Sequence, residues 1–265
     1  MRQILPARLA CRRVAGATLC LLALAGCAAI PQDGDGRRYT AIAPFSVGQP
    51  GGKLPGGWQP WVLSRFKRST EYRLVKDADG VTVVQAMADQ SASGMIKQLD
   101  IDLQATPWLT WRWRVPALIQ SADNTDRSRE DSPVRVVVTF DGDHSKLDFE
   151  EQAIASRVKA MTGREMPYAT IMYIWENMRP VDEVIESAHT SRVHMVVVES
   201  GMSRSGRWLT FSRNVAEDYR RIYGEKAGRI RSIGIMTDTD NTGEKTSAYY
   251  GDIRFSASAS PGSVR

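Results

Sequence analysis

The sequence predicts an all-β fold, an antiparallel sandwich of two sheets interrupted by two short helical insertions. Apolar and polar residues alternate with a period of two in many short runs, which is typical of strands with one buried face. Pro, Gly, Asn and Asp punctuate the gaps between these runs. Neither a second linker nor an internal repeat divides residues 41–256, so we expect one sandwich domain over that range.

Twelve strands are expected along this domain. Eight runs carry the alternation most clearly, and four further stretches fit it less well. The clear runs are residues 82–88, 109–115, 134–140, 170–175, 192–200, 207–212, 230–237 and 247–255. The further stretches are residues 42–47, 60–66, 71–76 and 95–103.

Two segments change to a helical period. The first spans residues 146–163, with acids early and bases late, as the helix dipole favours. Its apolar residues form one stripe: Leu147, Ile154, Val158 and Met161. The second begins at Asn214 as N-cap, has Glu217 three residues later, and ends at Gly224. Both segments are expected to be packing helices.

The first 26 residues have the layout of an export signal. Four Arg and no acid surround the start of an apolar run of about 12 residues, shorter than the ~20 that a membrane span needs. The run ends in Leu-Ala-Gly-Cys, which resembles the lipobox of bacterial lipoproteins. That resemblance implies a lipid on Cys27 that anchors the chain to the membrane, on the periplasmic side of the cell envelope. Ala28 then favours the outer membrane. The alternative is an ordinary signal peptide followed by a chance Cys.

Two polar segments flank the expected domain. Residues 27–40 are rich in Gly, Asp and Pro and are expected to be a tether between the lipid and the domain. Residues 257–265 are small and polar and are expected to form a flexible tail.

Charge and cysteine content exclude several classes. The chain has 35 Lys and Arg against 30 Asp and Glu, but four of those Arg lie in the signal. Cleavage would leave 31 bases and 30 acids, so the basic balance gives no argument for nucleic-acid binding. All three cysteines lie within residues 1–27, which excludes a disulfide framework and a cysteine metal site in the mature domain.

Several segments together resemble the bacterial domain-of-unknown-function family 3047. They include LPGGW at 54–58, WRWRV at 111–115, VRVVVTFDG at 134–142 and GREMPYATIMYIWEN at 163–177. RWLTFSRNVAEDYRRIYG at 207–224 and IMTDTDNTGEKTSAYYGDIRF at 235–255 continue the match. The resemblance covers nearly the whole mature chain. It implies no established activity.

A looser similarity indicates the type of sandwich. Residues 45–58, with their Gly-Trp pair, and residues 250–255, of the form Tyr-x-Asp-Ile-x-Phe, resemble galactose-binding-like jelly rolls, a fold of many carbohydrate-binding modules. A jelly-roll sandwich is therefore expected. In such a fold, calcium would bind between the first and last strands, which makes Asp252 the candidate ligand of a structural calcium ion. The alternative is that Asp252 pairs with an Arg or caps a neighbouring strand. No other cofactor is expected.

The loop after residue 237 superficially resembles a calcium-binding loop. Asp238 and Asp240 match the first two ligand positions of an EF-hand, but Thr242 and Tyr249 fail at the fifth and twelfth. The EF-hand is rejected, and we expect a turn held by the local hydrogen bonds of Asp and Asn side chains.

One predicted sheet face carries the candidate ligand site. Period two places Arg112 and Arg114 together, opposite the core residues of their strand, and Arg135 joins them if its strand is a neighbour. Paired arginines can bind a carboxylate or phosphate, and Trp175 can offer a stacking face beside Glu176. The alternative is a solvated face with cross-strand ion pairs.

No nucleophile elbow, metalloprotease helix, phosphate loop or dinucleotide fingerprint occurs in the sequence. We therefore expect a lipid-anchored envelope protein that binds a glycan or another anionic envelope ligand without catalysis. One alternative is a glycan-active hydrolase or lyase with Glu176 as a catalytic carboxylate. Another is a structural or assembly lipoprotein that binds a protein partner of unknown identity.

Overall fold

The structure is a computed structural model that describes residues 40–63, 66–162, 165–187 and 190–263. The expected export signal, Cys27 and nearly all of the expected tether lie outside these residues. Within the described ranges, no helix has the length and apolar character needed to cross a membrane.

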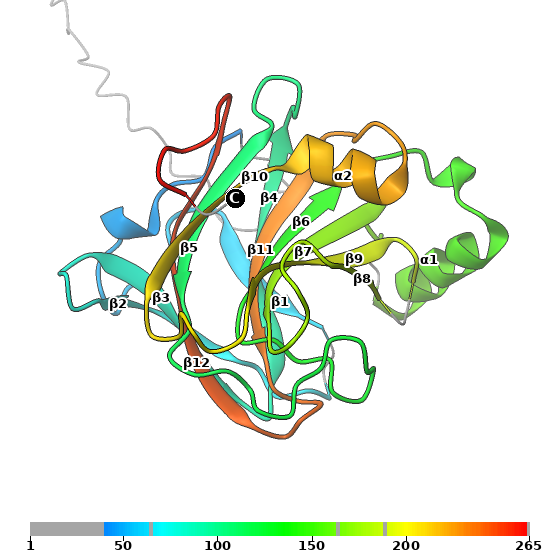
Figure 1. The fold of residues 1–265 in the computed structure, drawn as a ribbon. Helices are drawn as coiled ribbons and strands as arrows, with labels where there is room; N and C mark the ends of the chain where they lie inside the picture. Colours follow the sequence, from blue (N-terminus) through cyan, green and yellow to red (C-terminus); the bar gives the residue numbers. More distant parts are fainter. Residues whose placement is uncertain (1–39, 64–65, 163–164, 188–189, 264–265) are drawn as a thin grey trace, which may run out of the picture. The chain divides into compact units, whose positions relative to one another are not determined.

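Five strands form one sheet (Figure 1). Their spatial order is β10 (Trp208–Asn214), β5 (Trp108–Arg114), β12 (Lys245–Ser256), β3 (Thr82–Asp89) and β2 (Glu71–Lys76). Every neighbouring pair in this sheet is antiparallel. A bulge between Tyr250 and Ile253 shifts the register of β12 against β5.

Seven strands form the second sheet. Their order is β1 (Trp58–Val62), β4 (Ala92–Ile101), β11 (Ile230–Asp238), β6 (Arg135–Phe140), β7 (Ala169–Glu176), β9 (Val193–Ser200) and β8 (Val184–Glu186). The pairing is antiparallel except between β7 and β9, which run parallel. The predicted two-sheet β-sandwich with two helical insertions is confirmed, and the parallel pair is its one departure from antiparallel order among the described strands.

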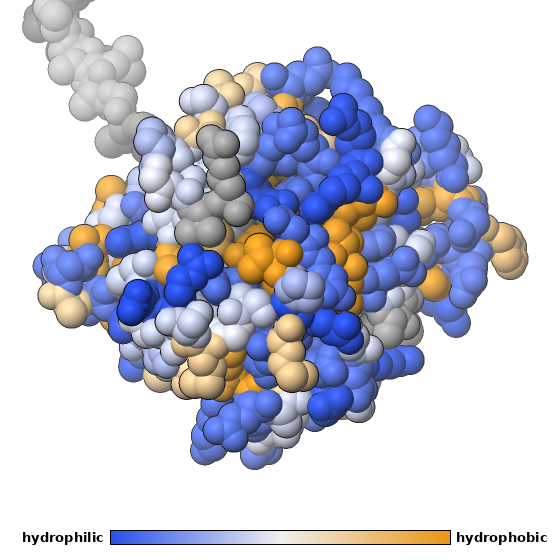
Figure 2. Space-filling model, in the orientation of Figure 1, coloured by the Kyte–Doolittle hydropathy of each residue, from blue (hydrophilic) through white to orange (hydrophobic). Residues whose placement is uncertain are grey.

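The core lies between the two sheets and is rich in aromatic rings. Trp111 and Phe211 of the five-stranded sheet stack with centroids 5.4 Å apart. Trp111 also meets Tyr173 of the seven-stranded sheet at 5.0 Å, so this contact joins the two layers. Each buried aromatic ring removes roughly 150–250 Å² from water, which makes this cluster a main source of stability. On the face seen in Figure 2, apolar side chains reach the surface only in patches among hydrophilic ones.

The two helices differ in how they pack. Helix α2 (Val215–Tyr223) buries Val215 and Tyr219 in the core, and Figure 1 places it at one end of the sheets. Its caps are confirmed: the Asn214 side chain accepts a hydrogen bond from the Glu217 amide, and Gly224 is left-handed with φ 70°. Helix α1 (Phe149–Thr162) lies beyond β8 and β9 in Figure 1 and is mostly exposed.

One local prediction was wrong, and one short strand was missed. Residues 42–47 were expected to form a strand, but Phe45–Val47 is a turn of 3-10 helix with Phe45 in the core. Pro44 has no amide N–H, and the Gly48 amide donates to the Phe45 carbonyl at 2.9 Å, so neither end of this turn offers a donor to a strand ladder. The short strand β8 was not expected, because its three residues are too few to show a period.

Candidate functional site

A row of polar and aromatic side chains crosses the outer face of the five-stranded sheet. Trp208 of β10 pairs in register with Arg114 of β5, and Arg114 pairs with Tyr249 of β12. Tyr249 pairs with Gln85 of β3, and Gln85 pairs with Arg73 of β2. Register partners lie on the same face of a sheet, so these five residues, which we name the sheet-face row, form one line across all five strands.

The members of the sheet-face row contact one another. The guanidinium of Arg114 lies 4.1 Å from the centroid of the Tyr249 ring and 5.6 Å from that of Trp208. Gln85 donates a hydrogen bond to the Tyr249 hydroxyl at 3.0 Å and accepts one from Arg73 at 3.0 Å. The row is therefore a continuous, ordered layer, which fixes the orientation of its rings and donors.

Asp77 fixes one part of this layer. It follows β2 in the turn to β3, and its carboxylate accepts hydrogen bonds from Arg114 at 2.6 Å and from the Trp208 indole at 2.5 Å. Arg114 Nε is buried and finds no hydrogen-bond partner among the described residues. Asp77 thus pairs with the charge of Arg114 and holds the Trp208 indole beside it.

Arg112 differs from Arg114 because it has no acid partner. Its guanidinium lies 4.5 Å from the centroid of the Trp208 ring. A side chain at Gly251 would place its Cβ 2.4 Å from Arg112 Cγ, so the lack of one there makes room for the arginine. No described residue makes a hydrogen bond or ion pair with this half-buried cation. It therefore offers unsatisfied donors beside the sheet-face row.

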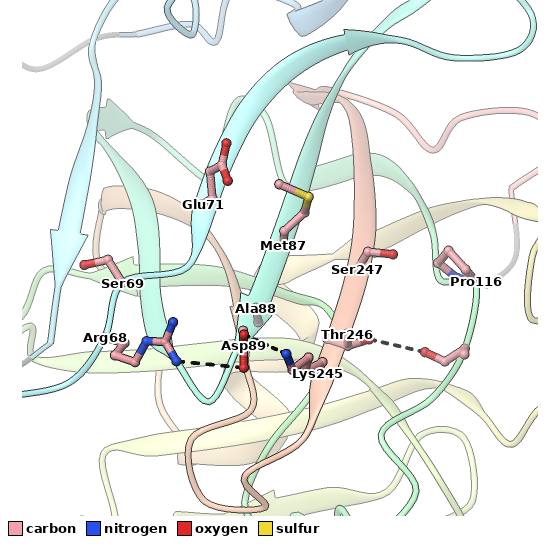
Figure 3. A pocket seen from close by; sticks show the side chains of 11 residues that line it. Arg68, Ser69, Glu71, Met87, Ala88, Asp89, Pro116, Lys245, Thr246 and Ser247 are labelled. Carbon is pink, nitrogen blue, oxygen red and sulfur yellow. Dashed lines mark hydrogen bonds and ion pairs between the residues drawn. The ribbon is translucent and has the colours of Figure 1, made fainter.

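A hollow of about 640 Å³ lies on the same face of the sheet, beside the row, over strands β2, β3 and β12 (Figure 3). Glu71, Met87 and Ser247 line it and are register neighbours on β2, β3 and β12. At one end of the hollow, Asp89 pairs with Lys245 at 3.0 Å and with Arg68 at 3.9 Å (Figure 3). Row and hollow together form a continuous surface that carries aromatic faces, charged groups of both signs and hydrogen-bonding groups.

Residues 56–254 match the profile of a family described as "Protein of unknown function (DUF3047)". The chain belongs to this family. The family resemblance expected from the sequence is confirmed, and no curated protein matches the DUF3047 chain.

Three solved structures resemble the DUF3047 chain in fold. One is a carbohydrate-binding module, CBM28, specific for non-crystalline cellulose, at 10% identity and TM-score 0.38, covering 83% of this chain and 96% of its own. Another is the K2 cleaved adhesin domain of Lys-gingipain, at 9% identity and TM-score 0.37, covering 82% and 97%. A third is the xyloglucanase domain of NopAA from Sinorhizobium fredii, at 8% identity and TM-score 0.38, covering 78% and 100%. Similarity this low carries no information on the ligand of the DUF3047 chain.

Of the predicted ligand residues of this DUF3047 chain, Arg112 and Arg114 share an outer sheet face. Arg135 does not join them, because β6 lies in the other sheet. Its side chain is 2% exposed and bonds Asp238 through Nε at 3.1 Å and Nη2 at 3.2 Å. Arg135 is thus a buried ion-pair partner, and its expected place beside Arg112 is corrected.

Trp175 cannot offer a stacking face. It is fully buried in the core between the sheets, and its indole donates a hydrogen bond to the Gly201 carbonyl at 2.9 Å. Strand β7 has apolar residues on both faces, so period two does not mark which face is solvated.

Glu176 is a buried acceptor for loop backbone groups. Its Oε2 accepts from the amides of Met178 at 2.6 Å and Arg179 at 2.9 Å, and its Oε1 accepts from the amide of Asn124 at 3.3 Å. These bonds hold two loops at the end of β7. They leave Glu176 away from the sheet-face row, since β7 belongs to the other sheet.

Sequence reasoning missed Trp208, Tyr249, Gln85 and Asp77. Trp208 and Tyr249 alternate with core residues in runs that were correctly predicted as strands, so the period of two could have shown that they point outward. Their alignment with Arg114 could not have been predicted, because strand order and register do not follow from the alternation.

Asp252 of β12 contacts a residue near the start of the domain. Its two oxygens accept hydrogen bonds from the Ser46 amide at 2.9 Å and the Ser46 hydroxyl at 2.7 Å. Ser46 belongs to the 3-10 turn Phe45–Val47, so Asp252 holds that turn against the last strand instead of pairing with an Arg or capping a strand. The calcium ion at Asp252 stays a prediction.

Among the described residues, a cluster of three aspartates lies at the end of the seven-stranded sheet. Asp131, Asp238 and Asp240 place one oxygen each within 4.8 Å of one another. Positive or polar groups already meet all three: Arg135 binds Asp238, Lys67 binds Asp240, and the Thr242 amide and hydroxyl bind Asp131 at 2.7 Å. The turn at 238–243 is thus held mainly by distant partners, which corrects the expectation of purely local hydrogen bonds.

Proposed function

We propose that this protein binds an acidic glycan on the outer face of its five-stranded sheet, without catalysing a reaction. The observation that carries the proposal is Arg112. This cation is stacked on Trp208 beside the sheet-face row and has no acid partner among the described residues. An anionic ligand group would supply that partner.

The chemistry of the row supports a sugar as the ligand. Trp208 and Tyr249 are half-buried, so part of each ring is open to solvent and can stack on the apolar face of a sugar ring. Gln85 and the arginines carry donors and acceptors for hydroxyl groups. Because contacts within the row already fix these side chains, little side-chain entropy is lost on binding.

The length of the row supports a chain rather than a single ring. Neighbouring strands lie about 4.8 Å apart, so five strands extend over roughly 19 Å from first to last. The hollow of about 640 Å³ lengthens this surface further. A surface of this length has room for several consecutive sugar rings.

Isothermal titration calorimetry with polygalacturonate and with neutral dextran tests the proposal. We expect the wild-type chain to bind polygalacturonate and to bind dextran at least about tenfold more weakly, since one lost charged contact is worth roughly 1.5–3 kcal/mol. Arg112→Gln and Trp208→Ala should each weaken binding to the acidic polymer. Arg231→Gln is the matched control, because Arg231 is half-exposed, pairs with Asp141 at 3.2 Å and lies on the other sheet. No binding of either polymer by folded protein overturns the proposal.

We further propose that the chain is anchored by lipid at Cys27 to the periplasmic side of the outer membrane. The support is the lipobox-like sequence Leu-Ala-Gly-Cys at the end of the apolar run, followed by Ala28. Metabolic labelling with radioactive palmitate, followed by membrane fractionation, tests this. Label in the wild type and none in Cys27→Ser is the expected result, and equal labelling of both would refute it.

A further inference from the structure

We propose a second, separate binding site on the outer face of the seven-stranded sheet, where a hollow of about 400 Å³ takes one neutral sugar ring stacked on Trp61. This site lies on the opposite sheet from the sheet-face row and does not depend on the function proposed above. We name it the Trp61 hollow, lined by Trp61, Lys67, Met172, Met236, Asp238 and Asp240 among others.

Two glycines place the indole on the sheet. Trp61 of β1 pairs with Gly94 of β4, and Gly94 pairs with Met236 of β11, so these residues share the outer face. A Cβ at Gly94 would lie 2.9 Å from Trp61 Cε3, and a Cβ at Gly234 would lie 3.6 Å from Trp61 Cζ3. A side chain at Gly94 would therefore push the indole away from the strands, whereas Gly234 lies at ordinary contact distance beneath it.

The close packing of the Trp61 indole on Gly94 fixes the orientation of its ring. Glycine inside a strand weakens it and often marks a place where another group approaches closely. Here the approaching group is the indole, which is half-buried and lines the hollow. An ordered aromatic face at the edge of a concave surface is what stacking on a sugar ring requires.

The charges around the hollow are internally balanced. At its base, Arg135 pairs with Asp238 through Nε at 3.1 Å. At its rim, Lys67 pairs with Asp240 at 2.5 Å. Arg127 and Glu130 also line the hollow, so three bases there face three acids and the lining carries no net charge. The hollow therefore favours a neutral ligand, in contrast to Arg112 on the other sheet.

The rim pair supplies the polar contacts that a sugar needs. The Lys67 and Asp240 side chains are 40% and 16% exposed, and Asp240 Oδ1 has no hydrogen-bond partner in the described part of the chain. An ammonium donor next to a carboxylate acceptor matches two neighbouring hydroxyl groups, one accepting and one donating. Met172 and Met236 give the floor an adaptable apolar surface.

The volume fits this ligand class. Small-molecule sites measure roughly 300–1,000 Å³, and a hollow of about 400 Å³ lies at the small end of that range. One sugar ring fits there better than the extended chain proposed for the sheet-face row.

Saturation-transfer difference NMR on the full chain in detergent tests the site. The probes are the methyl glycosides of glucose, galactose and mannose, together with N-acetylglucosamine, each at millimolar concentration. We expect transfer to at least one probe, and binding weakened roughly threefold to tenfold in Trp61→Ala, because an aromatic contact contributes about 0.5–1.5 kcal/mol beyond the buried area. Phe149→Ala is the control, because Phe149 is an exposed aromatic residue of α1 outside both sites, and it should leave this signal unchanged.

A second variant keeps the test decisive if Trp61→Ala does not fold. Asp240→Asn retains the size of the side chain and removes the rim carboxylate, so it should weaken the same probe while the melting temperature shows a folded protein. The proposal is overturned if none of the four probes shows transfer. It is equally overturned if Trp61→Ala and Asp240→Asn, both folded, keep the wild-type signal. Loss of polygalacturonate binding with an intact sugar signal would count only against the function proposed above.

Discussion

Arg112 stacks on Trp208 with its guanidinium 4.5 Å from the ring centroid, and no carboxylate meets it among the described residues. Arg114, two residues on, faces the same way but is paired with Asp77 at 2.6 Å. Two arginines on one strand face therefore have different roles. One is part of the scaffold, and the other is available to a ligand.

Asp77→Ala should destabilise the protein by about 1–3 kcal/mol, because it leaves Arg114 and the Trp208 indole without their shared acceptor. Urea unfolding at pH 7.5 measures this. Asp79→Ala is the control in the same turn, since exposed Asp79 only accepts a hydrogen bond from the Val81 amide. An equal loss in both variants would mean that turn formation, not the sheet-face row, depends on Asp77.

Arg135→Ala should be the more severe change, at about 3–5 kcal/mol, because it leaves Asp238 buried without its counter-charge. The matched control is Arg231→Ala, which removes a half-exposed pair with Asp141 and should cost about 1 kcal/mol or less. Chemical unfolding of both variants at pH 7.5 compares them. A similar, small loss in the two would contradict the assignment of Arg135 to the scaffold.

Stability should depend on pH through Asp238. Burial, opposed by Arg135 and aided by nearby Asp131, raises the pKa of Asp238 to about 6, above its ordinary value near 3.9. The folded state therefore holds this proton more tightly than the unfolded state. The stabilising contribution is present below about pH 4 and is lost as pH rises through about 6.

Asp238→Asn isolates this effect, because the amide does not titrate. The wild type should gain stability relative to the variant as pH falls from 7 to 4, measured by urea unfolding at each pH. A difference that stays constant over this range would show that the pKa of Asp238 is not raised.

Glu176→Gln should destabilise the protein by about 1–3 kcal/mol, because the amide presents an N–H to backbone donors that need an acceptor. Glu186→Gln, at a largely exposed side chain, is the control. Release of reducing ends from polygalacturonate, measured beside unfolding, separates the catalytic alternative. Hydrolysis by the wild type that vanishes in folded Glu176→Gln would establish catalysis and refute a purely binding role.

The alternation of apolar and polar residues determined much of the fold from the sequence. Strands such as Glu71–Lys76 and Arg135–Phe140 were located to within a residue, because a half-buried strand alternates in polarity and a fully buried one forms a short β-branched apolar run. The caps of α2 were also predicted correctly, since Asn214 and Gly224 each cap the helix through hydrogen bonds to residues within one turn. Residues 42–47 were misjudged because Phe45 is buried through a 3-10 turn, which a short apolar stretch does not distinguish from a strand.

Only part of the candidate site could be predicted from the same alternation. The sequence by itself determined that Arg112 and Arg114 face away from the core, that the described strands make a sandwich, and that the chain belongs with the DUF3047 family. Only the tertiary structure decided which arginine is free, that Trp175 and Arg135 are buried, and that Trp208 and Tyr249 complete the row. The physical reason is that period two fixes the direction of a side chain within its own strand. Its partners depend on strand order and register, which are set by contacts between residues far apart in sequence.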